Sequence, residues 1–178
     1  MKITGIKKVS FLSISCIAVM LAGTNVSRAQ ATATASVSAN VIAPVSLAKT
    51  VDMNFGNAAV AVGAGGTVVL NPASSRSTTG AGVTLPATAG TVSAASFTVS
   101  GAPNYTYAIT LPSSAVISGP ASSSMTVASF TSSPSATGLL SVSGTQILTV
   151  GASLSVSAGQ HSGTYTNATA VPVTVNYN

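Results

Sequence analysis

Very few side chains of this sequence are able to take part in acid–base or nucleophilic chemistry. The chain has one carboxylate side chain, Asp52, one histidine, His161, and no glutamate. Serines occur throughout, so a serine nucleophile with His161 and Asp52 is the one catalytic arrangement that the composition allows. No Gly-x-Ser-x-Gly turn between a strand and a helix accompanies it. We therefore expect His161 to be a loop residue, Asp52 to be a solvated strand or turn residue, and the protein not to be an enzyme.

The sequence also has too few acidic and metal-ligating side chains for paired-carboxylate catalysis or a metal site. Hydrolysis of glycosides by paired carboxylates needs two acids, and the chain has one. A zinc site needs three or four Cys, His or carboxylate ligands, and a calcium loop normally supplies several carboxylates. The single cysteine, Cys16, lies in the N-terminal segment described next. We expect no metal site, no cofactor and no catalytic residue.

The first 29 residues have the layout of a cleavable secretory signal peptide. Three lysines (Lys2, Lys7 and Lys8) precede an apolar stretch over residues 9–23. Ser27 and Ala29 then provide small side chains at a signal-peptidase site, which predicts cleavage between Ala29 and Gln30. The competing interpretation is a membrane anchor, but the stretch is shorter than the ~20 residues that a spanning helix needs. We expect an exported protein without a transmembrane segment after cleavage.

The chain that starts at Gln30 is almost free of charge. Lys49, Arg76 and Asp52 are its charged residues, which gives a net charge of +1. Two cations cannot build a nucleic-acid groove, because each phosphate contact needs its own positive charge. The sequence therefore predicts no nucleic-acid partner, and a protein partner instead.

Apolar and polar residues alternate with period two along most of this part of the chain, and no segment shows convincing helical periodicity. Such alternation is typical of strands with one buried face. The alternating segments are 31–41, 45–55, 95–99, 105–111, 125–127, 146–150, 154–156 and 171–177. In the last of these the C-terminal strand residues Val173, Val175 and Tyr177, together with Val171, face one way.

Glycine and proline mark the turns between these segments, at residues 63–66, 80–82, 118–120 and 158–163. Many short strands with one apolar face each favour an all-β fold, an Ig-like or pilin-like antiparallel β-sandwich over residues 30–178. Val, Leu and Ile are expected to fill the core together with a few large side chains. These are Phe55, Phe97, Phe130, Tyr105 and Tyr107.

The C-terminal half resembles a known bacterial family. Residues 149–156, the turn 159–165 and the closing residues 173–178 look like the final signature of the bacterial domain of unknown function 4402, and residues 53–56, 66–70 and 97–101 fit the same pattern. These motifs consist of Gly, Tyr and alternating Val, so they indicate a fold family and not a site. The resemblance implies a secreted or surface-exposed domain of a Gram-negative envelope, in the periplasm, on the cell surface or outside the cell.

A looser similarity links the chain to subunits of chaperone–usher pili, which end in an alternating strand with a tyrosine next to last. Tyr177 has that position, and Gly163 lies upstream as in those subunits. Such subunits also donate an N-terminal strand to a neighbour. Residues 30–42 are either such a donated strand or the first strand of this domain. Its apolar face is formed by Ala33, Ala35, Val37, Ala39 and Val41.

The sequence thus predicts an exported structural protein that associates with itself or with an envelope assembly partner, in the manner of a pilus or fimbrial subunit. The alternative is a secreted binding module, an adhesin or a carbohydrate-binding domain, that uses the loops at one end of the sandwich.

Overall fold

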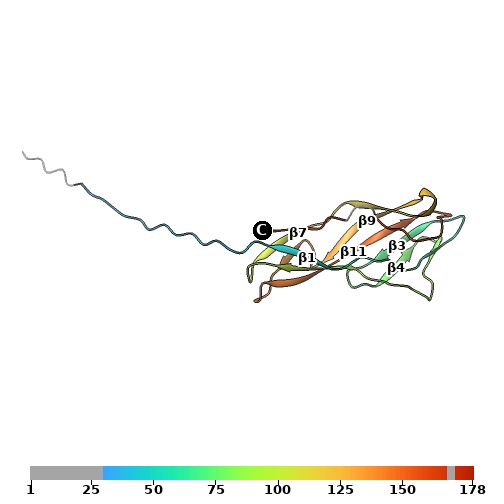
Figure 1. Cartoon of the computed structure of the whole chain (residues 1–178), viewed down its shortest axis with the longest axis horizontal. Helices are drawn as coiled ribbons and strands as arrows, with labels where there is room; N and C mark the ends of the chain where they lie inside the picture. The colour runs from blue at the N-terminus through green and yellow to red at the C-terminus, as the bar shows by residue number, and fades with distance from the viewer. Residues whose placement is uncertain (1–29, 168–170) are drawn as a thin grey trace, which may run out of the picture. The chain divides into compact units, whose positions relative to one another are not determined.

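The computed structural model describes residues 30–167 and 171–178 (Figure 1). The expected signal peptide, residues 1–29, lies outside the described residues. The chain divides into two compact units, Met1–Asn40 and Val41–Asn178. In the first unit, residues 30–40 form no helix and no strand, and their side chains are exposed. All of the regular structure described below belongs to the second unit.

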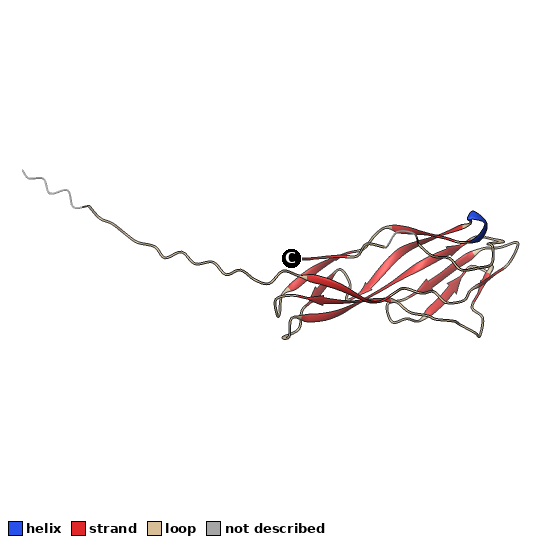
Figure 2. Ribbon diagram, viewed as in Figure 1, coloured by secondary structure: helices blue, strands red, loops and turns tan. Residues whose placement is uncertain are grey.

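The described residues of the second unit form twelve antiparallel strands and one short 3-10 helix (Figure 2). Within the described ranges there is no α-helix, and no helix is long and apolar enough to cross a membrane. The strands are β1 (Ser46–Val51), β2 (Ala59–Val60), β3 (Gly66–Leu70), β4 (Arg76–Thr79), β5 (Val83–Thr84), β6 (Ala95–Ser100), β7 (Thr106–Thr110), β8 (Ser114–Ser118), β9 (Ser124–Ser133), β10 (Thr137–Leu139), β11 (Thr145–Val156) and β12 (Thr174–Tyr177), with η1 (Pro120–Ser122) between β8 and β9.

The long strand β11 is the centre of the larger, seven-stranded sheet. Its first half pairs with β6 and its second half with β3, while β9 pairs along the other edge. Gly151 lies where β11 passes from one partner to the next, and a Cβ there would lie 2.2 Å from the carbonyl oxygen of Leu70. Only glycine permits this close approach, so it allows one strand to serve both ends of the sheet. β1 extends the sheet beyond β6, β4 beyond β3, and β8 beyond β9.

A smaller sheet with the strand order β10-β7-β12 covers one end of the large sheet. Tyr107 of β7 and Val175 of β12 pack against Val99, Leu148 and Val150 of β6 and β11. Tyr107 is fully buried, its hydroxyl donates to Gln146 Oε1 at 2.7 Å, and burial raises the pKa of the phenol. The two layers confirm the predicted all-β fold, an antiparallel β-sandwich.

A second core cluster fills the other end of the molecule. Val68, Val127, Leu154 and Val156 come from β3, β9 and β11, and Val83 comes from the two-stranded β2-β5 sheet. The small β10-β7-β12 sheet does not contribute to this cluster. The two ends of the sandwich are therefore covered by different segments.

Several details differ from the sequence-based expectations. β11 is one continuous strand where two short strands were predicted. Tyr105 is 44% exposed and does not belong to the core, because it precedes β7 and stacks edge-on against Tyr177 at a centroid distance of 5.7 Å. The C-terminal alternation is confirmed: Val173, Val175 and Tyr177 are more buried than Thr174 and Asn176.

Candidate functional site

The main concave feature of the second unit is a groove of about 1150 Å³ along the sandwich. Two irregular segments form its walls, residues 52–60 after β1 and residues 160–167 together with Val171 and Val173 before β12. Strands of the large sheet form its floor. The groove therefore lies where the large sheet carries no continuous second layer among the described residues.

The floor of the groove is apolar and only partly covered. Val150, Leu154 and Val156 of β11 line it and are buried. Around them, large side chains of the neighbouring strands are half-buried. These are Phe97 of β6, Met125 and Phe130 of β9, and Ile117 of β8. Large apolar side chains are normally covered in a protein core. This floor is therefore an apolar sheet face that the described residues cover only in part.

Arg76 of β4 holds the first wall in place from behind. Its guanidinium donates to the carbonyl oxygens of Phe55 and Asn57, each at 2.6 Å, and to that of Ala89 at 3.3 Å. Gly56 lies between the first two, with φ +67°, and a Cβ there would lie 2.4 Å from the oxygen of Ala89. A partly buried cation thus satisfies the carbonyls of an irregular segment that no continuous ladder supports.

The backbone of this wall is paired on the side away from the groove. Asn54 exchanges hydrogen bonds of 2.8 and 3.0 Å with Ser93, and the amide of Asn57 donates to Ala89 at 2.7 Å. Alternation along an extended chain then places the amides of Met53 and Phe55 on the opposite edge. Among the described residues, no strand pairs with that edge.

Tyr165 organises the second wall. Its hydroxyl donates to the carbonyl oxygen of His161 at 2.7 Å, accepts from Gln160 Nε2 at 2.9 Å, and lies 2.7 Å from Ser123 Oγ. Its ring packs so closely on Gly119 that a Cβ there would meet the ring at 2.5 Å. The wall is thereby attached to the turn around η1.

Val171 and Val173 continue this wall toward β12. β12 pairs with β7 through Val175↔Ile109 and Tyr177↔Tyr107, and it is the last strand of the β10-β7-β12 order. Its other edge pairs with no described strand. The wall and β12 together therefore form a sheet edge beside an apolar floor.

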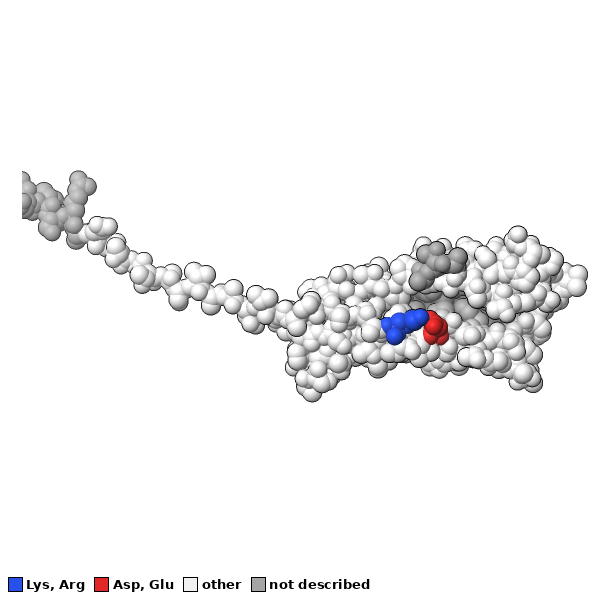
Figure 3. Space-filling view, in the orientation of Figure 1, with Lys and Arg blue, Asp and Glu red and all other residues white. Residues whose placement is uncertain are grey.

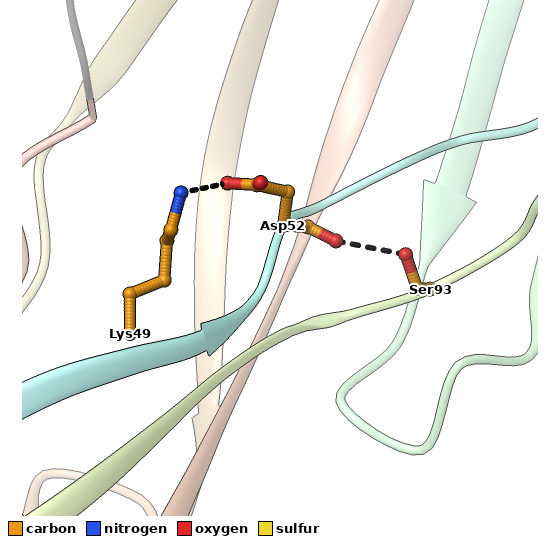
Figure 4. Close-up of polar contacts among 3 residues, drawn as sticks. All are labelled: Lys49, Asp52 and Ser93. Carbon is orange, nitrogen blue, oxygen red and sulfur yellow. Dashed lines mark hydrogen bonds and ion pairs between the residues drawn. The ribbon is translucent and has the colours of Figure 1, made fainter.

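The two titratable residues singled out in the sequence both line the groove, but they do not form a catalytic group. Asp52 is 80% exposed and its carboxylate pairs with Lys49 Nζ at 2.5 Å, while its backbone oxygen accepts from Ser93 Oγ at 2.8 Å (Figure 4). His161 is an exposed loop residue. Within the described residues, its imidazole forms no hydrogen bond to a carboxylate or a hydroxyl, and no three metal-ligating side chains gather.

Charge is scarce around the groove. On the face that Figure 3 draws, the charged side chains meet at one place, where Lys49 adjoins Asp52. Since these two charges compensate each other, the groove has an apolar floor, polar walls and no net charge.

The other predicted site residues lie at the end of the sandwich and before it. The hydroxyl of Tyr177 donates to the carbonyl oxygen of Ala43 at 2.9 Å and accepts from the amide of Ala102 at 2.7 Å. Tyr177 therefore attaches the residues before β1 to the C-terminal strand. The residues of the possible assembly strand form no strand in the structure, with Val37 95% and Val41 93% exposed. Whether this segment joins its own sheet or a neighbour's stays a prediction.

Sequence reasoning did not identify the groove or the role of Arg76. One signal for the groove is present: the odd-numbered apolar set continues through Met53 and Phe55 after the strand has ended at Val51. Nothing in the sequence shows which distant segments flank these side chains.

Comparison with known proteins identifies the family of the chain. The family model described as "Domain of unknown function (DUF4402)" matches residues 45–177. No curated protein and no solved structure matches the chain. The match starts just before β1 and ends at the last residue of β12, so it covers every described strand and does not include residues 30–44. The chain belongs to the DUF4402 family.

Proposed function

We propose that this chain is an exported structural protein of a bacterial cell envelope that associates with copies of itself by β-strand addition. The observation that carries the proposal is the segment 31–42. Within it, residues 31–41 alternate strictly in sequence, their apolar side chains are exposed, and they belong to no described strand. Strand addition gives such a segment both hydrogen-bond partners and a place for its apolar face.

Burial of the exposed apolar face would stabilise an assembly. Val37 and Val41 are exposed to water, and burial of each side chain contributes about 1.5–3 kcal/mol. Threonine, valine and isoleucine, which provide five of the twelve residues 31–42, favour extended backbone. The segment is thus suited to become a strand once an edge and an apolar surface are supplied.

The near-neutral surface supports association between many copies. The chain from Gln30 carries Lys49, Arg76 and Asp52, and two of these pair with each other. Repeating copies of such a subunit do not repel one another, whereas a strongly charged subunit would.

The likeness to pilus subunits adds to this support. Tyr177 is next to last in the chain, and its strand β12 lies at the edge of a sheet. Filament subunits that exchange strands need such an edge, since a fully paired sheet has no place for another strand. In this role His161 and Asp52 have no catalytic task, and we propose that the protein is not an enzyme.

The test changes the apolar face of the segment. Val37→Asp with Val41→Asp places carboxylates where a dry contact is proposed, at a cost of several kcal/mol. We expect the unaltered chain from Gln30 to form oligomers in size-exclusion chromatography and filaments or layers in electron microscopy. The double variant should remain a monomer with an unchanged circular dichroism spectrum.

The matched control carries the same two charges on the polar face, as Ser38→Asp with Asn40→Asp, and should still assemble. Normal assembly by the Val37→Asp, Val41→Asp chain, or a monomeric unaltered chain at every concentration, overturns the proposal. Unfolding of the Val37→Asp, Val41→Asp monomer also overturns it, because the segment is then the first strand of its own domain.

A further inference from the structure

We infer that the groove between residues 52–60 on one side and residues 160–167, Val171 and Val173 on the other receives residues 33–41 of a second copy of this chain, and that its floor selects this strand by its small side chains. The inference rests on the proposed function and names the acceptor site. No described segment covers the floor, and the occupant is chosen on length, backbone edges, side-chain size, charge and the path of the chain.

Length is the first criterion. Along β11 the floor extends from Val150 to Val156, six residue steps or about 20 Å at the rise of a strand. The apolar face from Ala33 to Val41 spans eight steps, about 26 Å when extended. A single extended segment of this length covers the floor and leaves a short connection to Ala43.

The backbone edges are the second criterion. The wall after β1 is paired behind with Ser93 and Ala89, and its opposite edge, at Met53 and Phe55, has no described strand beside it. On the other side, Val171 and Val173 lead into β12, an edge strand. A strand laid between these walls finds backbone partners and completes the second layer of the sandwich over the floor.

Side-chain size explains why the strand is rich in alanine. The floor already holds Phe97, Phe130 and Met125, which are large and half-buried. Large side chains arriving from above would overfill the space, since well-packed cores lose stability when methylene groups are added. The small side chains of Ala33, Ala35 and Ala39 suit a floor that already carries large side chains.

The charges of the segment and of the groove also favour residues 33–41 as the occupant. Residues 30–45 contain no charged side chain, and the charges at the groove, Lys49 and Asp52, compensate each other. An acidic or basic peptide would have to leave its charges without partners over the apolar floor, which is costly.

The path of the chain before β1 favours a second copy over the chain's own segment. Ala43 is bound through its carbonyl oxygen by Tyr177, and Val45 and Leu47 pack against the first core cluster. Pro44 restricts Ala43 to extended conformations. A return of residues 33–41 into their own groove requires a reversal within this fixed stretch, whereas insertion into another copy requires none.

Disulfide trapping tests the location directly. The chain from Gln30 has no cysteine, so each copy can carry one introduced thiol. One population carries Ala35→Cys, Val37→Cys or Ala39→Cys, and the other carries Ala115→Cys in β8, on the floor of the groove. After mixing and oxidation, we expect a covalent heterodimer for at least one of the three positions. The control is Val142→Cys, which is 84% exposed and outside the groove, and it should give no heterodimer.

A size test addresses the selection by the floor. Ala35→Leu enlarges the side chain that faces the floor, and Ser36→Leu makes a comparable enlargement on the other face. We expect Ala35→Leu to weaken association by about tenfold or more relative to Ser36→Leu, measured by analytical ultracentrifugation. Equal effects, or tighter association of the Ala35→Leu chain, overturn the selection by small side chains.

The outcomes separate this inference from the proposed function. Assembly of the unaltered chain without any Ala115→Cys heterodimer overturns the groove as acceptor and leaves self-association standing. A disulfide that forms only inside a chain carrying both Val37→Cys and Ala115→Cys assigns the groove to the chain's own segment and overturns the second copy. A chain that never associates overturns both.

Discussion

At the scale of single residues, Arg76 has the most distinctive environment in the described part of the chain. It is partly buried in β4 and forms no described ion pair, and its guanidinium is shared among the carbonyls of Phe55, Asn57 and Ala89. The planar fork of arginine suits several acceptors at once, which a lysine cannot reproduce. One side chain therefore fixes the wall on which the groove depends.

This environment predicts that Arg76→Ala destabilises the protein. Hydrogen bonds from a charged donor contribute about 1.5–3 kcal/mol each, and their loss leaves carbonyls without partners. We expect the free energy of unfolding to fall by about 2–3 kcal/mol in urea titrations monitored by circular dichroism.

Lys49→Ala is the matched control for Arg76→Ala, because it removes the same charge from an exposed pair. It should cost about 0–1 kcal/mol. Equal losses in the two variants would contradict the assignment of Arg76 as the support of this wall.

The sequence allowed the exposed positions of His161 and Asp52 to be expected, since neither residue lies in an apolar alternating face. It did not allow the environment of Arg76 to be expected. Its acceptors are backbone oxygens of residues 13 to 21 positions away, and backbone carbonyls leave no trace in the sequence. Tyr105 was misplaced for a related reason: alternation cannot tell the first residue of a strand from the loop residue that precedes it.

At the scale of elements, β11 determines how the two ends of the sandwich are joined. It carries buried residues for both core clusters, Leu148 and Val150 for one and Leu154 and Val156 for the other. The apolar–polar alternation of each half of β11 was visible in the sequence. Their continuity was not, because Gly151 is typical of a turn in sequence and serves here as a point of close approach to Leu70.

Neighbouring residues of β11 lie on opposite faces of the sheet, so we expect their truncation to cost very different amounts of stability. Leu148 is 0% exposed and Ile147, next to it, is 57% exposed. Leu148→Ala removes buried methyl groups and leaves a cavity, so we expect a loss of about 2–5 kcal/mol of unfolding free energy. Ile147→Ala should cost about 1 kcal/mol or less, mainly through strand propensity. Chemical denaturation of both variants measures the difference, and similar losses would contradict the register of β11.

At the scale of the whole molecule, the fold was predictable and the groove was not. Alternation and turn residues are local, and they were enough for an antiparallel sandwich. The groove is made by segments near residues 55, 125, 155 and 165, and it exists because no described strand fills one position. A missing strand has no local signal. In our proposal, the alternating residues 31–41 of a second copy fill this position.

A groove that is filled by another copy predicts a stability that depends on concentration. Anything that binds only the folded state stabilises it by mass action, by about 2.7 kcal/mol at one hundred times the dissociation constant. For a domain of this size that corresponds to a rise of roughly 8 °C in Tm. We therefore expect the Tm of the unaltered chain from Gln30 to rise with protein concentration in differential scanning calorimetry.

Two chains serve as controls for this last prediction. The chain with Val37→Asp and Val41→Asp should keep a low Tm at every concentration, and so should a chain that begins at Ala43, because residues 30–41 are exposed and contribute no strand to the sandwich. Adding a synthetic peptide of residues 31–42 to the shortened chain should raise its Tm toward that of the assembled protein. A shortened chain that fails to fold would show instead that the segment belongs to its own sheet. An unaltered chain that self-associates without any change in Tm would mean that association leaves the groove empty.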